Sequence, residues 1–421
     1  MSTHAMLKSA ASGHRKTTAV AAIGLLVAFA ACSAHADTVT DWNQTTHEVM
    51  KAARASGGPA ARSLAMVHVA MSDAINSVQN RYTRTIANVE VNPAASSDAA
   101  AASAARQILT QLYPNQKSMI DEAYAVSVKA IPEGPAKTQG VALGEQVAAA
   151  VQADRATDGT NVPDTYRPLT SPGVWVPTTP PLTAQYARAK PWVLKSADQF
   201  RPDQPPQLSS ALYARDYNET KNFGGAKSTT RTPEQSEAVK FWTQANLGPA
   251  WQAAAVQLSA AKGLGLAENA RLFALLNMGY ANTFINDWDA KFTYNFWRPV
   301  TAIRNGDIDG NDATERDPGW TSLNETPMHP EYPSQASIIC GMSVGILESV
   351  FGPKPSTPFT VTDFTNPNLK RQFAGIAQMA EEHVNVRIWG GIHFRNSLEV
   401  ADGMGKRIAA YLIDNALKPT R

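Results

Sequence analysis

The sequence has little of what marks several common protein classes. Only Cys32 and Cys340 are cysteines among its 421 residues, so a framework of disulfide bonds is excluded. Neither sign of charge dominates, because 38 Lys and Arg residues are balanced by 36 Asp and Glu residues. Nucleic-acid-binding domains carry a clear cationic excess, so this balance argues against a nucleic-acid partner. Hydrophobic residues make up 43% of the chain, which is typical of a globular protein.

Long uncharged runs are also scarce, and the one that stands out lies near the N-terminus. A cationic segment, an apolar run and a small-x-small site follow one another at Lys8–Lys16, Ala19–Cys32 and Ala34–Ala36. This order is typical of a secretory signal peptide, and the run is too short to span a membrane. We therefore predict a signal peptide over residues 1–36 and an exported protein, periplasmic or secreted. An uncleaved anchor and lipoprotein processing at Cys32 are the alternatives.

Removal of residues 1–36 would change the charge balance and the cysteine content. The remaining chain has 35 cationic and 36 acidic side chains, and Cys340 is its single cysteine. No later apolar run is long enough for a membrane span, so we predict none.

Helical patterns fill most of the remaining sequence, and the alternation typical of β-strands is scarce. Ten prolines between residues 158 and 206 exclude long helices there, and the interleaved Trp175, Trp192 and Phe200 indicate a packed loop region. We predict an all-α fold of helical bundles. Its predicted parts are an N-terminal helical half at 37–156, a Pro-rich ordered connection at 157–207 and a C-terminal helical half at 208–421.

Three polar clusters in the last third carry the candidate chemistry. Lys291 and Arg298 are seven residues apart, so we expect both cations on one face of a helix that Pro299 ends or bends. Ser334 and Gln335 precede a helical run and so lie at a helix N-terminus, where anions bind.

The third cluster pairs Arg387 with His393 across Gly390-Gly391, where a break in the helix would bring the two side chains together. Taken singly, each cluster also fits an ordinary structural role. The alternatives are surface cations beside aromatic residues, a serine helix cap and a structural histidine.

Together the clusters resemble the three-part signature of the vanadium-dependent haloperoxidases and the type 2 phosphatidic-acid phosphatase superfamily. That signature is Lys, six residues, Arg-Pro; then Pro-Ser-Gly-His; then Ser-Arg, five residues, His, three residues, Asp. Lys291 and Arg298-Pro299 match the first part, Pro333-Ser334 the start of the second, and Arg387 and His393 the third. The flanking sequence from about Trp42 onward looks like that of secreted bacterial members of the haloperoxidase branch.

The resemblance implies a tetrahedral oxyanion, vanadate or phosphate, bound in a bundle core. Lys291, Arg298 and Arg387 would bind its oxygens, Ser334 and the Gln335 amide would add hydrogen bonds, and His393 would ligate vanadium. The small-molecule substrates would be hydrogen peroxide, a halide and an organic acceptor. In a phosphatase no cofactor would be needed, because the histidine attacks a phosphate ester and becomes phosphohistidine.

Four positions depart from the signature. Ala336 replaces the acid–base histidine, Gln335 the glycine and Val386 the serine. Ser397 stands where the family has aspartate, and it would orient His393 without raising its basicity as a carboxylate does.

The leading hypothesis is therefore a vanadate-dependent haloperoxidase-like enzyme. The loss of the histidine at Ala336 leaves open an acid phosphatase, or an anion-binding homologue with impaired turnover. Substitutes for the acid–base group would be His383, His329 or Glu331. No feature of the sequence indicates an oligomeric state.

Overall fold

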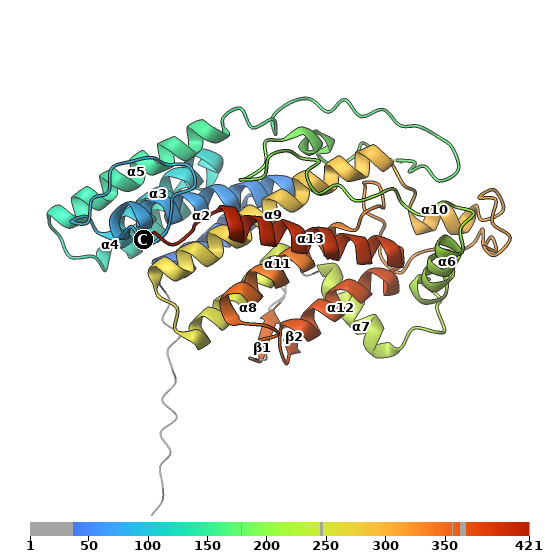
Figure 1. Cartoon of the computed structure of the whole chain (residues 1–421). Helices are drawn as coiled ribbons and strands as arrows, with labels where there is room; N and C mark the ends of the chain where they lie inside the picture. Colours follow the sequence, from blue (N-terminus) through green and yellow to red (C-terminus); the bar gives the residue numbers. More distant parts are fainter. Residues whose placement is uncertain (1–36, 178, 245–246, 356, 363–367, 421) are drawn as a thin grey trace, which may run out of the picture. The chain divides into compact units, whose positions relative to one another are not determined.

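A computed structural model describes residues 37–177, 179–244, 247–355, 357–362 and 368–420. The predicted signal peptide, with Cys32, lies outside these residues. The helices are α1 Thr38–Ala52, α2 Gly57–Gln79, α3 Ser97–Leu112, α4 Lys117–Lys129, α5 Pro135–Arg155, α6 Ala211–Gly224, α7 Pro233–Gln244, α8 Leu247–Lys262, α9 Leu266–Tyr294, α10 Pro299–Arg304, α11 Gln335–Phe351, α12 Ile376–Trp389 and α13 Arg395–Asn415. Two short 3-10 helices lie at Pro114–Gln116 and Ala184–Arg188. The all-α prediction is confirmed (Figure 1).

Helices α2 and α9 link the two predicted halves. The two helices pack against each other, and α2 also packs on α3. Both are buried on nearly every side, because α2 is rich in alanine and α9 in leucine, alanine and aromatic residues. Side chains from both halves form one hydrophobic core. The proposed boundaries at 156 and 208 stay a prediction.

Buried tryptophans pack parts of the Pro-rich connection against the helices. The indole of Trp192 is buried, and the guanidinium carbon of Arg155 lies 3.7 Å from its ring centre. Asn282 of α9 accepts from the Trp192 amide and donates to its carbonyl, at 2.8 Å each. Trp175 is also buried. The loop is therefore anchored to the helices by aromatic side chains.

The helix after Lys291 ends earlier than we expected. Asn295 takes a left-handed conformation (φ 49°) and ends α9, and Arg298 is the N-cap of the separate helix α10. Pro299 therefore begins a helix at its first position instead of ending one, which suits its fixed φ and missing N–H. The prediction that Lys291 and Arg298 share a helix face is wrong.

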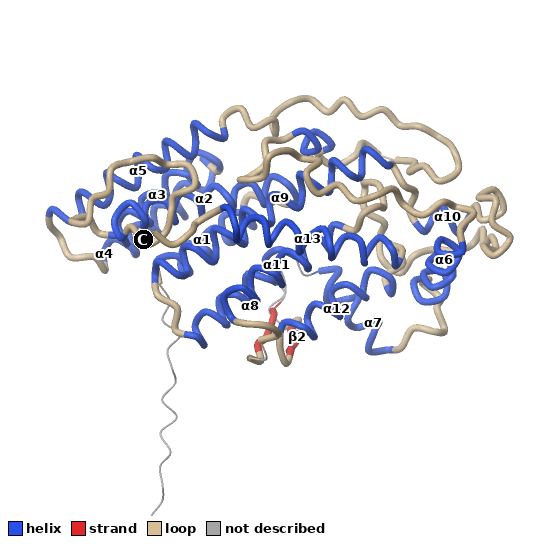
Figure 2. The backbone as a smooth tube through the Cα atoms, viewed as in Figure 1, coloured by secondary structure: helices blue, strands red, loops and turns tan. Residues whose placement is uncertain are grey.

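A small antiparallel hairpin, which the sequence patterns did not predict, is formed by β1 Phe359–Thr362 and β2 Lys370–Phe373 (Figure 2). Phe359 pairs with Phe373, and both are buried in the core. Each strand has four residues; β1 packs against α8 and β2 against α12.

Helices α11 and α13 are packed at very close range (Figure 1). A Cβ on Gly341 of α11 would overlap the carbonyl oxygen of Asp402, and a Cβ on Gly405 of α13 would overlap that of Ile338. Only glycine permits such backbone contact at these two positions. Within the part of the chain described, no helix is long and apolar enough to cross a membrane.

Candidate functional site

The three sequence clusters meet where helices begin and end. Lys291 lies in the last turn of α9, Arg298 caps α10, and Ser334 caps α11. Arg387 lies in the last turn of α12. His393 follows Gly391, which has φ 74° and turns the chain between α12 and α13. All five side chains are buried.

The hydrogen bonds of His393 determine which ring nitrogen carries its proton. Nε2 lies 3.2 Å from Nη1 of Arg298, and a guanidinium can only donate, so Nε2 is the acceptor. Nδ1 therefore carries the proton and donates to Oε1 of Glu331 at 2.7 Å. Burial, followed by the charge of Arg298, holds the pKa of His393 well below its usual value. The ring is thus neutral, with its lone pair at Nε2.

Arg298 is held mainly by backbone carbonyls. Nε donates to the carbonyl of His329 at 3.0 Å, and Nη1 donates to that of Ile392 at 2.7 Å. Nη2 donates to Nδ1 of His329 at 3.1 Å. Burial lowers the pKa of Arg298 to about 10, so the group stays cationic at neutral pH. Arg298 therefore ties the loop at His329 to the chain at His393.

Lys291 uses its three N–H donors on the loop before Ser334. Nζ donates to the carbonyls of Pro330 and Glu331 at 2.9 Å each, and also to that of Pro333. Asp287, one turn earlier, lies 3.7 Å from Nζ. Burial lowers the pKa of Lys291 to about 8, although Asp287 opposes that shift. In this arrangement the positive charge of Lys291 is available to attract an anion, and the hydrogen bonds of Lys291 fix the loop.

Several buried donors in the first turn of α11 have no partner. Ser334 Oγ, Gln335 Nε2 and Ser337 Oγ are all covered, and none makes a hydrogen bond within the described chain. Ser334 does not cap its helix through its side chain. Buried polar atoms are nearly always paired, so a group of unpaired donors makes this helix start a candidate site for a polar ligand.

Arg387 also has a buried donor without a hydrogen-bond partner in the described chain. Its Nη2 is buried without a hydrogen-bond partner among the described residues, and its Nε makes one long bond of 3.5 Å to the carbonyl of His383. Burial lowers its pKa to about 10, so Arg387 remains a cation. Its positive charge contributes to lowering the pKa of His393. Arg387 therefore has N–H donors available to bind an anion.

His383 is fixed by two tryptophans. Trp242 stacks on its ring at 4.5 Å and 4°, and Nε1 of Trp251 donates to Nδ1 at 3.0 Å. The proton is therefore on Nε2, which is buried and unpaired. Burial and the charge of Arg387 hold the pKa of His383 well below its usual value. His383 can donate a hydrogen bond, and it stays neutral near pH 7.

His329 contacts Arg298 at Nη2, whereas His393 contacts it at Nη1. Its ring packs on Trp288 with 5.0 Å between the ring centres, and its Nδ1 accepts from Arg298. Burial and the charges of Arg298 and Lys291 hold the pKa of His329 well below its usual value. His329 is therefore another neutral group that Arg298 orients.

Glu331 is placed differently from what we predicted. Its Oε1 accepts from Nδ1 of His393 and from the Phe394 amide, at 2.7 and 3.0 Å. Burial raises its pKa to about 7, against the opposing charge of Arg298. We expected Ser397 to orient His393, but its hydroxyl lies beside the Glu331 carboxyl group and makes no well-formed hydrogen bond. No sequence pattern indicated this pairing, because 62 residues separate the partners.

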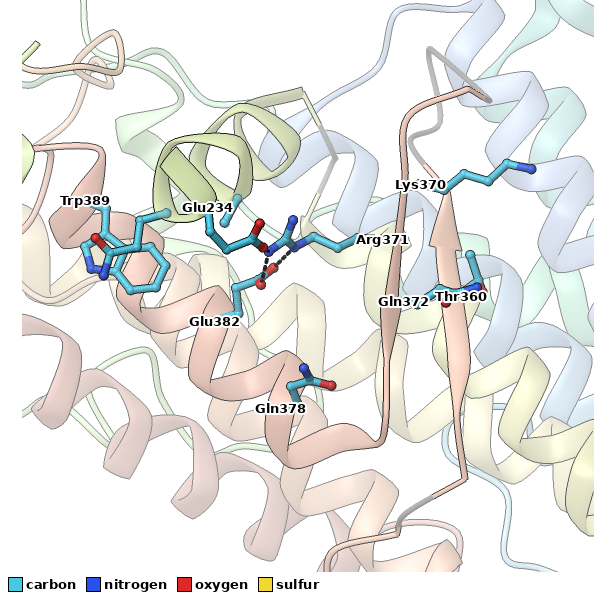
Figure 3. A pocket seen from close by; sticks show the side chains of 10 residues that line it. Glu234, Thr360, Lys370, Arg371, Gln372, Gln378, Glu382 and Trp389 are labelled. Atoms are coloured by element: carbon cyan, nitrogen blue, oxygen red, sulfur yellow. Dashed lines mark hydrogen bonds and ion pairs between the residues drawn. The ribbon is translucent and has the colours of Figure 1, made fainter. Parts of the chain in front are cut away.

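A surface hollow of about 670 Å³ lies between α7, the hairpin and α12 (Figure 3). Arg371 of β2 bridges Glu234 and Glu382 there through short ion pairs. Glu382 also accepts from Nε1 of Trp242, the ring stacked on His383. None of the predicted site residues lines this hollow.

Among the residues that the structure describes, no group of three His, Cys, Asp or Glu side chains could hold a metal cation. The donor set instead suits an anion.

Known proteins resemble both the sequence and the fold. Residues 271–420 match the family described as the VCPO second helical-bundle domain. The vanadium chloroperoxidase of Curvularia inaequalis is 25% identical over 381 residues, which cover 70% of this chain and 62% of that protein. The aligned region thus spans less than two thirds of that relative.

Two solved structures share the fold. A bacterial vanadium-dependent iodoperoxidase superposes with a TM-score of 0.75 at 24% identity, covering 91% of this chain and 98% of that one. A bacterial vanadium-dependent chloroperoxidase, in its apo form, gives 0.67 at 17% identity, with 84% and 92% covered. Residues 271–420 thus match the model of the VCPO second helical-bundle domain, and the chain shares its fold with these vanadium-dependent haloperoxidases.

Proposed function

We propose that this protein binds vanadate at His393 and oxidises a halide with hydrogen peroxide. The observation that carries the proposal is the state of His393. Its ring is neutral, its proton is held on Nδ1 by Glu331, and its Nε2 lone pair points at the cation Arg298. A neutral imidazole nitrogen is the form that ligates a metal centre.

The donors around His393 fit a tetrahedral oxyanion. Arg298 and Arg387 supply two buried positive charges, and Lys291 a third. Ser334 Oγ, Gln335 Nε2 and Arg387 Nη2 supply unpaired donors. Guanidinium groups bind two oxygens of such an anion at once, which gives geometric selectivity. We infer that these residues, with His393, form the cofactor site.

When bound, vanadate supplies a Lewis-acidic centre at which peroxide is activated for transfer of oxygen to a halide. The protein residues hold the anion, exclude water and fix the proton positions. Ala336 offers no acid–base group. His383 supplies a neutral N–H at Nε2, so it stabilises negative charge by hydrogen bonding and is a poor general acid near pH 7.

The direct test is a measurement of bound vanadium followed by activity assays. Protein incubated with vanadate and dialysed should retain about one vanadium per chain, and His393→Ala should retain none. The loaded protein should oxidise iodide or bromide when peroxide is added. Equal vanadium in the parent and His393→Ala would overturn the site assignment.

A second candidate is a phosphatase at the same site. The same neutral His393, with its lone pair at Nε2, has the form of a nucleophile for phosphoryl transfer. Hydrolysis of p-nitrophenyl phosphate without peroxide, lost in His393→Ala, would favour it. Vanadate binding with neither activity would instead favour an impaired homologue, for which Ala336 is the cause.

We also propose that the protein is exported after cleavage before Asp37. Asp37 then becomes both the new N-terminal residue and the cap of α1, since its side chain accepts from the Thr40 amide. N-terminal sequencing of protein recovered from the periplasm or medium tests this. A mature chain that starts elsewhere, or that carries lipid at Cys32, would contradict it.

A further inference from the structure

The carboxylate that holds His393 comes from an unexpected segment. Glu331 belongs to the loop before α11, whereas the family signature places the corresponding carboxylate four residues after the histidine, where this chain has Ser397. The 2.7 Å bond from His393 Nδ1 to Glu331 Oε1 is buried, and the carboxylate is fully covered. The carboxylate is thus present, but from another part of the chain.

Glu331 is held so that it can keep this position. The amide of Phe394 donates to the same oxygen at 3.0 Å, so two consecutive residues bind one carboxylate oxygen. The backbone of Glu331 is fixed as well, since its amide donates to the carbonyl of Phe296 at 2.9 Å and its carbonyl accepts from Lys291. A carboxylate held in this way has little freedom to leave the imidazole.

The position of Ser397 supports a change of partner. Ser397 is buried in the first turn of α13, and its hydroxyl lies beside the Glu331 carboxyl group. Its carbonyl accepts from the Ser334 amide at 3.3 Å. A serine at 397 is smaller than an aspartate and leaves the carboxylate side of His393 to Glu331.

We propose that Glu331 is the positioning residue for His393, and that it replaces the carboxylate absent at position 397. By accepting from Nδ1, Glu331 keeps the proton on that nitrogen and leaves Nε2 as an acceptor beside Arg298. Partners of this kind fix the tautomer and orientation of a ligating histidine, and their loss typically costs about 10- to 100-fold in affinity. The proposal rests on the proposed oxyanion site, although the tautomer of His393 can be measured without any ligand.

The first experiment measures the His393 tautomer in the ligand-free protein. Nitrogen-15 NMR of histidine-labelled protein distinguishes protonated Nδ1 from protonated Nε2, and His393→Gln assigns the signal. The parent should show protonated Nδ1, and Glu331→Ala should lose that preference. Ser397→Ala should keep it, because Ser397 makes no bond to the ring. An unchanged His393 signal in Glu331→Ala would overturn the proposal.

The second experiment restores a carboxylate from the other segment. Vanadate affinity, measured by equilibrium dialysis, should fall about 10- to 100-fold in Glu331→Ala and recover at least tenfold in Glu331→Ala with Ser397→Asp. If Glu331→Ala does not fold, Glu331→Gln keeps an oxygen acceptor and should retain the tautomer with weaker binding. Failure of Ser397→Asp to restore either the tautomer or the affinity would count against the replacement.

The two experiments separate this proposal from the proposed function. If the parent protein binds no vanadate but Glu331→Ala still changes the His393 tautomer, the function fails and the positioning role stands. If vanadate binds and is lost in His393→Ala, but Glu331→Ala changes neither readout, the function stands and the positioning role fails.

Discussion

Nη1 of Arg298 donates to Nε2 of His393 across 3.2 Å, so the two side chains that the sequence places 95 residues apart meet directly. The same guanidinium holds the carbonyls of His329 and Ile392. Arg387, by contrast, makes one long hydrogen bond of 3.5 Å. The two arginines should therefore respond differently to removal.

Arg387→Ala should weaken vanadate binding by about 10- to 100-fold and change stability little, because its donors are mostly unpaired without an anion. Arg298→Ala should weaken binding as well and lower the free energy of unfolding by about 2–4 kcal/mol, because two buried carbonyls lose their donor. Equilibrium dialysis and urea unfolding measure the two effects. Equal losses of stability would contradict the distinction.

Restoration of the missing acid–base group should increase turnover. Ala336 is 4% exposed and lies in the first turn of α11 beside Ser334 and Ser337. If the site oxidises halides, Ala336→His should raise the rate by about 10²- to 10⁴-fold. Ala336→Asn is the matched control, since it adds similar bulk without an acid–base group and should give no gain. Equal rates for both variants would attribute any change to packing.

Because of the contact between α11 and α13, alanine substitutions at two nearby glycines should have opposite effects on stability. A Cβ on Gly405 would overlap the backbone of Ile338, whereas a Cβ on Gly403 meets nothing within 4 Å. Gly405→Ala should lower the free energy of unfolding by about 1–3 kcal/mol. Gly403→Ala should raise it by up to about 1 kcal/mol, because alanine has a higher helix propensity than glycine at an exposed position. Urea unfolding of both variants tests the pair. Destabilisation by Gly403→Ala would contradict this account of the contact.

Two buried histidines of the first helices should make the protein sensitive to acid. His68 Nε2 lies 3.0 Å from Asn43 Oδ1, and His47 Nε2 lies 3.1 Å from Gln252 Oε1. Burial lowers the pKa of His47 to about 4 and that of His68 to about 3. Both folded pKa values lie below the unfolded value of about 6.5, so the unfolded chain takes up protons first as the pH falls.

Stability is therefore lost between about pH 6.5 and pH 4, by about 3 kcal/mol for each imidazole. His68→Gln removes one titrating group and keeps a donor for Asn43. It should reduce the loss of unfolding free energy between pH 7 and pH 4 by about 3 kcal/mol. Denaturant unfolding at both pH values measures this, and a variant with the pH dependence of the parent would refute it.

The sequence was sufficient for the helical fold and for the three clusters, because helical periodicity and motif spacing are local properties. It misled us at Pro299, which fits both the end of one helix and the first residue of the next. The pairing of Glu331 with His393 could not be predicted from the sequence. That bond depends on how a loop and a helix junction 62 residues apart come together, and no spacing rule encodes it.

The glycine contact between α11 and α13 also bears on the speed of ligand capture. Ser334 and His393 stand at the starts of these helices, which touch backbone to backbone at Gly341 and Gly405. Their separation is therefore set by the main chain before any anion arrives. The anion then need not draw the two helices together when it binds, so we expect selectivity to show in the rate at which the anion leaves.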